Sequence, residues 1–276
     1  YQFTATGSGW TNLTDFKYRN ISVNGVTTRS ALVCCRGGKI GHLVVGKKTS
    51  QNQNAVSRSI TLPTAHSPHG IERIPGHGLI VVAMTGGADP ENGYIQVLRP
   101  DPSNASKFIK SQGVRFPDVH AFTWDPTRQV LWAIGRNQLR SYRVTGTGAA
   151  AKLTGTGAFP AINIIPPGKS ATIGHDVQPD YSNRNNLLIT NSQGAYEIDI
   201  TNPRAPHMTA FQLAGSIKSF CRDSSGVSFW IRADGTSQNS DYRSKRIWFR
   251  TPGSTNQNVL TPFDMYRART PNAGFF

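Results

Sequence analysis

Three histidines recur at matching points in three successive, loosely similar segments of the chain: His69, His120 and His175. Each opens a short strand-like run, which a polar turn joins to a second, more apolar run. Imidazole groups titrate near neutral pH and transfer protons, and three neutral imidazoles can also hold a divalent metal. A fourth segment has Ser219 at the position that corresponds to the three histidines. We therefore expect a one-sided histidine cluster.

The predicted site has three catalytic candidates, His69, His120 and His175, with His120 or His175 as the base and His69 as its partner or a ligand. The same three would be the ligands if a metal is bound, with Ca, Mn and Zn as the divalent candidates. Four further residues are predicted to bind substrate, because a planar guanidinium grips a carboxylate and a phenol can share protons. These are Arg36, Arg136, Arg222 and Tyr181. In the structural alternative, each histidine merely bonds to backbone and the arginines lie on the surface.

The elements that would position these side chains repeat at intervals of roughly 50 residues, each repeat reading as four short strands. This period predicts an all-β chain, a single β-propeller of four-stranded antiparallel blades, whose first strands line the central axis. Five blades is the first choice and six shorter blades the alternative. The predicted domain spans residues 1–276, with blades at 17–63, 66–114, 117–162, 172–214 and 216–270 and a closing strand at 1–16.

The second strand of each repeat is the most apolar, as in 79–84 and 130–135. A strand buried on both faces requires this pattern, so these runs are the predicted core. Trp132 and Trp230 occupy similar places in two repeats and are predicted to pack between blades. Asp125-Pro-Thr-Arg is typical of a tight turn between inner strands.

The chain has 276 residues, with 30 Lys and Arg against 15 Asp and Glu, a net charge of +15. This imbalance favours an anionic partner, and a polysaccharide or oligosaccharide is the prediction. Nucleic acid is not expected, because the basic residues are dispersed and no nucleic-acid-binding motif occurs. No apolar stretch is long enough to span a membrane, and we expect a monomer.

Three glycosylation sequons, at Asn12, Asn20 and Asn104, mildly favour a secreted, extracellular glycoprotein. The three cysteines are the adjacent pair Cys34 and Cys35, and Cys221. Two alternatives remain open for them: one disulfide that joins Cys221 to Cys34 or Cys35, or three buried thiols.

Phosphate-binding loops, HExxH, paired CxxC and GxSxG motifs are absent from the sequence. The His69-Gly70, VHAF (119–122) and GHDV (174–177) elements resemble those of secreted propeller polysaccharide lyases, the rhamnose–glucuronate lyases among them. The resemblance implies a carbon–oxygen lyase that acts on a uronate-containing glycan at a histidine-lined axial pocket. The alternatives are a non-catalytic glycan- or anion-binding propeller, such as a lectin or scaffold, and a three-histidine metal-dependent enzyme.

Overall fold

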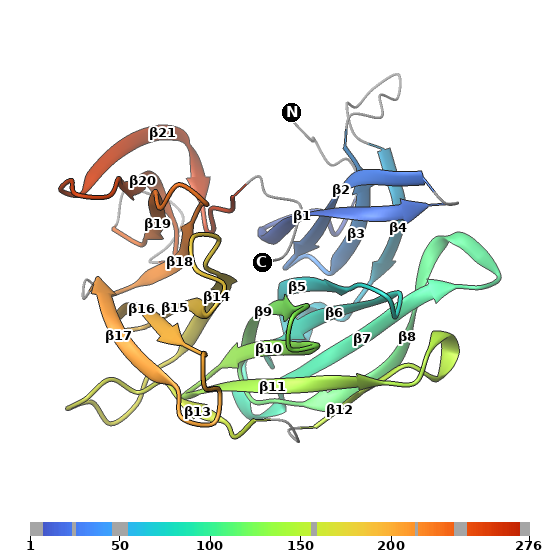
Figure 1. Ribbon diagram of the computed structural model, residues 1–276. Coiled ribbons are helices and arrows are strands. Elements are labelled where there is room, and N and C mark those ends of the chain that lie inside the picture. The colour runs from blue at the N-terminus through green and yellow to red at the C-terminus, as the bar shows by residue number, and fades with distance from the viewer. Residues whose placement is uncertain are drawn as a thin grey trace. The chain divides into compact units, whose positions relative to one another are not determined.

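The computed structural model describes residues 8–23, 26–45, 55–155, 159–212, 215–234 and 242–270. These residues form β-strands joined by turns and three short 3-10 turns, at Thr64–His66, Pro90–Asn92 and Gly148–Ala150. The strands run as antiparallel meanders in sequence order (Figure 1). No helix in these ranges is long and apolar enough to cross a membrane.

The strands group into successive runs of four. The first run is β1 (Leu13–Val23), β2 (Val26–Cys35), β3 (Lys39–Val44) and β4 (Ala55–Thr61). The second run is β5 (Pro68–Ile74), β6 (Leu79–Met84), β7 (Tyr94–Asp101) and β8 (Asn104–Arg115). A single parallel bridge, Ser59 to Lys107, joins β4 to β8 and merges the two runs into an eight-stranded sheet.

The third run is β9 (Val119–Asp125), β10 (Val130–Gly135), β11 (Gln138–Thr145) and β12 (Lys152–Thr154), and the short β13 (Ile162–Asn163) also pairs with β11. The fourth is β14 (Gly174–Pro179), β15 (Asn186–Asn191), β16 (Gly194–Asp199) and β17 (His207–Gln212). The fifth is β18 (Ile217–Arg222), β19 (Ser228–Arg232), β20 (Ser244–Arg250) and β21 (Gln257–Met265). The all-β, four-stranded antiparallel character expected from the repeats is confirmed.

The chain divides into two compact units. The first contains the residues up to Val119 together with Val144–Leu153, and the second contains His120–Arg143 and Thr154–Thr270. Residues 13–16, assigned from sequence to a closing strand, are part of β1 and pair with β2. Residues 1–7 of that predicted strand lie outside the described residues. The single-domain organisation and the number of blades stay predictions.

Each unit has an apolar core that contains a second strand buried at every position, β6 in the first unit and β10 in the second. In the first unit, Ile80, Val82 and Met84 of β6 pack with Leu32 and Ile71. In the second, Trp132 of β10 packs with the β15 residues Leu187 and Ile189. Trp230 of β19 lies in a further cluster with Leu188 and Phe220. The predicted core positions of Trp132 and Trp230 are confirmed.

In three sheets, an aspartate stands at the same position in the turn after the first strand. Asp125 Oδ1 accepts the backbone N–H groups of Thr127 and Arg128. Asp180 accepts the N–H of Ser182 in the same way, and Asp223 that of Ser225. A short carboxylate side chain that bonds the backbone two residues on stabilises a tight turn. These aspartates hold the ends of the first strands in place.

Of the two alternatives for the cysteines, the structure shows three buried thiols, Cys34, Cys35 and Cys221, with no disulfide among them. The Cys221 thiol donates a hydrogen bond to the Ala268 carbonyl, 3.2 Å away. Burial raises the pKa of Cys35 to about 11 and that of Cys221 to about 12, so both stay protonated and unreactive near neutral pH.

Candidate functional site

The predicted histidines lie at a shared structural feature, a β-bulge near the start of the first strand. In β5 the pairing with β6 shifts between Pro68 and Gly70, which leaves His69 as the extra residue. In β14 the shift falls between Gly174 and Asp176 and leaves His175. A bulge turns the extra side chain away from the regular alternation of the strand, and bulges are common beside functional sites.

The bulge also identifies the counterpart of these histidines in the fifth sheet. The pairing of β18 with β19 shifts between Ile217 and Ser219, so the extra residue is Lys218. The expectation that Ser219 occupies this position was therefore wrong by one residue. The Ser219 hydroxyl instead accepts the Ala268 N–H at 3.0 Å.

Backbone conformation supports the same correspondence and extends it to His120. A non-glycine residue with positive φ stands two positions before the extra residue in several sheets. These residues are Asn12 (φ 55°) before Thr14, Ser67 (φ 47°) before His69, Asp118 (φ 54°) before His120, and Ser216 (φ 64°) before Lys218. Left-handed conformations are unfavourable for such residues and concentrate at functional sites. The equivalent positions are therefore Thr14, His69, His120, His175 and Lys218.

Three of these five side chains belong to the second unit, and contacts link them. The rings of His120 and His175 pack edge to face, with their centroids 5.4 Å apart. The Lys218 ammonium nitrogen, Nζ, lies 3.1 Å from His175 Nε2. All three residues are buried, with 6–8% of their surface exposed. The structure thus joins two of the predicted catalytic histidines and adds a lysine that the sequence reading missed.

Arg267 holds the backbone of this cluster. Its Nη2 donates to the carbonyl of His120 at 3.1 Å and to that of His175 at 2.7 Å. Two residues on, Arg269 binds both carboxylate oxygens of Asp176, at 2.7 and 3.0 Å. The segment after β21 therefore fixes the starts of β9 and β14 through two arginines. We call His120, His175, Lys218 and Arg267 the cationic cluster.

The electrostatics of the cluster lower the pKa of Lys218. Burial, followed by the positive charge of Arg267, lowers the pKa of Lys218 to about 8. At pH 7 about one tenth of the lysine is then the neutral amine, against well under one thousandth for an ordinary lysine. An ammonium would donate to Nε2 of His175, and a neutral amine would accept from a protonated Nε2. The two nitrogens can therefore share one proton in either state.

The other predicted residues are divided between the two units. His69 belongs to the first unit, where its Nδ1 donates to the Ser67 carbonyl at 2.8 Å. Arg36 is exposed in the turn after β2 of that unit. Arg136 lies in the turn after β10, and its carbonyl accepts the Gly174 N–H next to His175. Tyr181 is partly exposed in the turn between β14 and β15.

Arg222 lies at the opposite end of β18 from the cationic cluster. Its guanidinium donates to Asp180 at 2.7 Å, to Glu197, and through Nε to the Ser228 hydroxyl at 3.0 Å. Burial opposes the charge of Arg222, but Glu197 and Asp180 outweigh it and raise the pKa of Arg222, and the two carboxylates tie β18 to the fourth sheet. Arg222 is thus not brought to the histidines, and its charge is already neutralised.

A divalent metal fits the cluster poorly. No group of three or more His, Cys, Asp or Glu side chains suited to a metal ion occurs in the described ranges. Nε2 of His175 faces Lys218, whose ammonium form would repel a cation at that nitrogen. A metal held by His69, His120 and His175 stays a prediction.

Arg267 and Arg269 were missed because no periodicity singles them out. Arg267 and Arg269 follow β21 at the very end of the predicted fifth blade, and only the tertiary structure brings them to β9 and β14. A sequence signal did exist for Lys218. It directly precedes a small residue at the strand start, as His69 precedes Gly70 and His120 precedes Ala121.

Comparisons with known proteins relate the chain to others by fold. No protein-family model matches it, and no curated protein matches its sequence. Among solved structures, a protein of unknown function from Desulfotomaculum acetoxidans is 11% identical with a TM-score of 0.55, over 91% of this chain and 69% of that one. A Lactobacillus plantarum protein is 11% identical with a TM-score of 0.56, over 92% and 86%.

A third similar structure, from Bacteroides fragilis, is named as a candidate 6-phosphogluconolactonase. It is 13% identical with a TM-score of 0.55, over 88% of this chain and 70% of that one. At such identities the similarity concerns the fold alone. The strand order, the successive four-stranded meanders and these structural neighbours together place the chain, by fold, among the all-β proteins of the β-propeller type.

Proposed function

We propose that the cationic cluster is the proton-transfer centre of an enzyme that hydrolyses the lactone of an anionic sugar acid. The observation that carries the proposal is the buried Lys218–His175 pair, with 3.1 Å between Nζ and Nε2 and a lysine pKa of about 8. Catalytic bases are most effective when their pKa lies near the working pH. The name of the Bacteroides fragilis neighbour, a candidate lactonase, supports this reaction class.

The reaction assigns a task to each group. The neutral Lys218 amine takes a proton from a water molecule, whose oxygen forms a bond to the lactone carbonyl carbon. The tetrahedral oxyanion forms beside Arg267 and the imidazoles, whose positive field stabilises it. The ring carbon–oxygen bond then breaks, and the leaving alkoxide takes the proton back from the Lys218–His175 pair. Water is consumed, and the product is the open sugar acid.

The uronate lyase expected from sequence is the second candidate, and the same pair favours it. A lyase must neutralise a uronate carboxylate and remove the proton from the neighbouring carbon. A lysine with a lowered pKa among cationic groups suits both tasks. A partner that is an acidic glycan, and a secreted location, likewise stay predictions.

One experiment separates these candidates. The purified protein is incubated with glucono-δ-lactone, with its 6-phosphate and with a glucuronate-rich polysaccharide. Lactone hydrolysis is followed by acid release, and elimination by the ultraviolet absorbance of the new double bond. We expect kcat/KM for the phosphorylated lactone to rise with pH until about pH 8, where the amine of Lys218 becomes the main form.

Lys218→Met should lower kcat/KM at least 100-fold, because general acid–base catalysis contributes about that much. Lys245→Met, in the same sheet, is the matched control and should retain activity. Elimination without lactone hydrolysis would favour the lyase. Binding of the sugars with no turnover of any of them would overturn both reactions and leave a binding propeller.

A further inference from the structure

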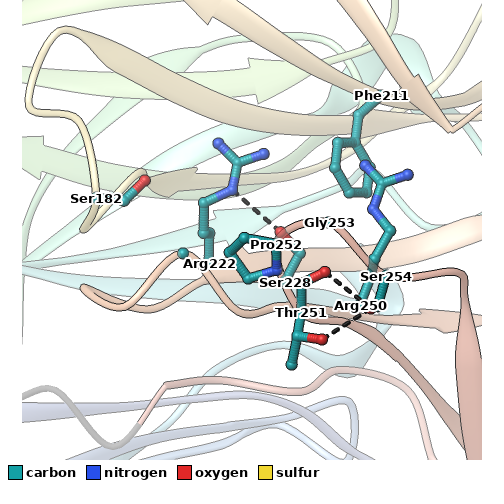
Figure 2. Close-up of a pocket in the computed structure, with 10 residues that line it drawn as sticks. Ser182, Phe211, Arg222, Ser228, Arg250, Thr251, Pro252, Gly253 and Ser254 are labelled. Carbon is teal, nitrogen blue, oxygen red and sulfur yellow. Dashed lines mark hydrogen bonds between the residues drawn. The ribbon is translucent and has the colours of Figure 1, made fainter.

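A pocket in the second unit lies away from the cationic cluster, at the opposite end of β18. Its volume is about 490 Å³, within the range of ligand-binding pockets. It is formed by Phe211 of β17, the ends of β18 and β20, and the turn that joins β20 to β21 (Figure 2). Its charged lining residues are two arginines, Arg222 and Arg250.

The two arginines differ in whether a carboxylate pairs with the guanidinium group. Arg222 is held by Asp180, Glu197 and Ser228, and it shapes the wall of the pocket. Neither of its carboxylate partners is among the residues that line the pocket. Arg250, by contrast, has no carboxylate within ion-pair distance in the described part of the chain. Arg250 therefore supplies the pocket with a positive charge that no carboxylate of the described residues neutralises.

Arg250 is held in place by an aromatic ring. Its guanidinium carbon lies 4.0 Å from the centroid of the Phe211 ring, and Figure 2 shows the two side chains against each other. Phe211 is itself fixed, because it stacks on Phe220 at 4.5 Å and meets Trp230 edge to face at 6.0 Å. A guanidinium that stacks on a ring keeps its N–H edges available for a ligand. The donor is thus preorganised.

Hydroxyl groups complete the lining of the pocket. The Ser228 hydroxyl accepts from Arg222 Nε, so its own O–H can donate to another group. In the turn, the Thr251 hydroxyl donates to the Ser254 hydroxyl at 2.7 Å, and Ser254 donates to the Thr251 carbonyl at 2.8 Å. Gly253, with φ 75°, permits the tight turn that places both hydroxyls at the pocket.

We propose that this pocket is a second ligand site, which binds one uronate unit, with the carboxylate on Arg250 and the sugar hydroxyls on the serine and threonine side chains. A fixed guanidinium matches a carboxylate through two parallel N–H···O bonds. Hydroxyl-rich lining beside it selects a polyhydroxylated ligand over a simple anion. The site stands on residues separate from the cationic cluster, so it does not require the proposed reaction.

Ligand-observed NMR titration tests this site, with sodium glucuronate as the probe and glucose and inorganic phosphate as comparisons, at constant ionic strength. We expect the wild-type chain to bind glucuronate at least tenfold more tightly than glucose. Arg250→Gln should weaken glucuronate binding at least tenfold. Arg246→Gln is the matched control, since it removes one charge from the same strand outside the pocket and should leave binding unchanged.

The proposal is overturned by no preference for glucuronate over glucose, by equal binding by Arg250→Gln and wild type, or by an equal loss in Arg246→Gln. Phosphate binding as tight as glucuronate binding would also overturn it and would indicate a general anion site. Lys218→Met separates the two sites, because glucuronate binding at this pocket persists in that variant. If binding is lost there instead, the ligand belongs to the cationic cluster and the pocket is not a site.

Discussion

At the scale of single residues, Lys218 lies in an environment that a lysine disfavours. A lysine is seldom buried, because its ammonium loses its hydration there. Here it has 6% of its surface exposed, beside another cation, with a histidine as its hydrogen-bond partner. A residue held in such a position weakens the fold and calls for a functional reason.

Lys218→Met should therefore stabilise the protein at neutral pH while it removes activity. The folded pKa of about 8 lies below the ordinary lysine pKa of 10.5. The folded state thus binds fewer protons between these values, and stability of the wild type rises with pH across that window. The pKa difference corresponds to a penalty on the order of 3 kcal/mol below pH 8.

Thermal unfolding of both proteins measures this effect. At pH 7 the Met variant should have the higher Tm, and the gap should narrow as the pH rises from 8 to 10.5. A variant that is less stable than wild type at pH 7 would show that Lys218 acts as a structural donor instead of a strained functional group.

At the scale of elements, the first strands carry both the bulges and the buried ion pairs. In the first unit, Glu72 of β5 is fully buried and binds two residues of β1. It accepts from Lys17 Nζ at 3.0 Å and from Arg19 at 2.7 and 2.9 Å. The charges of these two residues outweigh the cost of burial and lower the pKa of Glu72. The triad fixes how β1 lies against β5.

Glu72→Gln should lower the free energy of unfolding by about 3–5 kcal/mol, because it leaves Lys17 and Arg19 buried without a counter-charge. Chemical denaturation at pH 7 measures this loss, and Glu91→Gln, on an exposed turn, is the control with an expected change near zero. Because the folded pKa is lowered, the stability from Glu72 is present above the unfolded value and is lost as pH falls below it. The variant should therefore lose less stability in acid than the wild type, and an equal loss would contradict this role.

At the scale of the whole molecule, the net charge of +15 is spread along the chain and is not gathered in one tail. Such a charge raises the local concentration of anionic partners without selecting among them. Selectivity then has to come from fixed groups such as Arg250, and the overall charge mainly accelerates the encounter.

Affinity for a glucuronate-rich polysaccharide should accordingly fall at least tenfold between roughly 0.05 and 0.5 M salt, because ions screen exposed charges beyond the Debye length. Elution from an immobilised polysaccharide under a salt gradient measures this. Arg36→Gln, which removes one exposed charge, should shift elution only slightly. Retention that is independent of salt would contradict the electrostatic account.

The sequence by itself determined the architecture and half of the candidate cluster. Three signals specify four-stranded antiparallel sheets: the repeat of roughly 50 residues, turn residues such as Asp125, and the apolar second strands. Each of these signals depends on residues that are close in sequence, within one repeat. The recurrence of His120 and His175 marked one position in two repeats for the same reason. Only the tertiary structure decided that Lys218, and not Ser219, is their counterpart, since a one-residue bulge changes pairing without changing composition.

The tertiary structure alone also brought Arg267 to the backbone of His120 and His175, across 147 and 92 residues of sequence. In the tertiary structure, Arg222 forms ion pairs with Asp180 and Glu197, and Arg250 stacks on Phe211 at the pocket. Long-range contacts of this kind depend on how separate strands are placed in space. The local sequence pattern does not encode that placement. The repeated strands could therefore be predicted from the sequence, whereas the contacts made at the ends of the strands by Lys218, Arg267 and Arg250 could not.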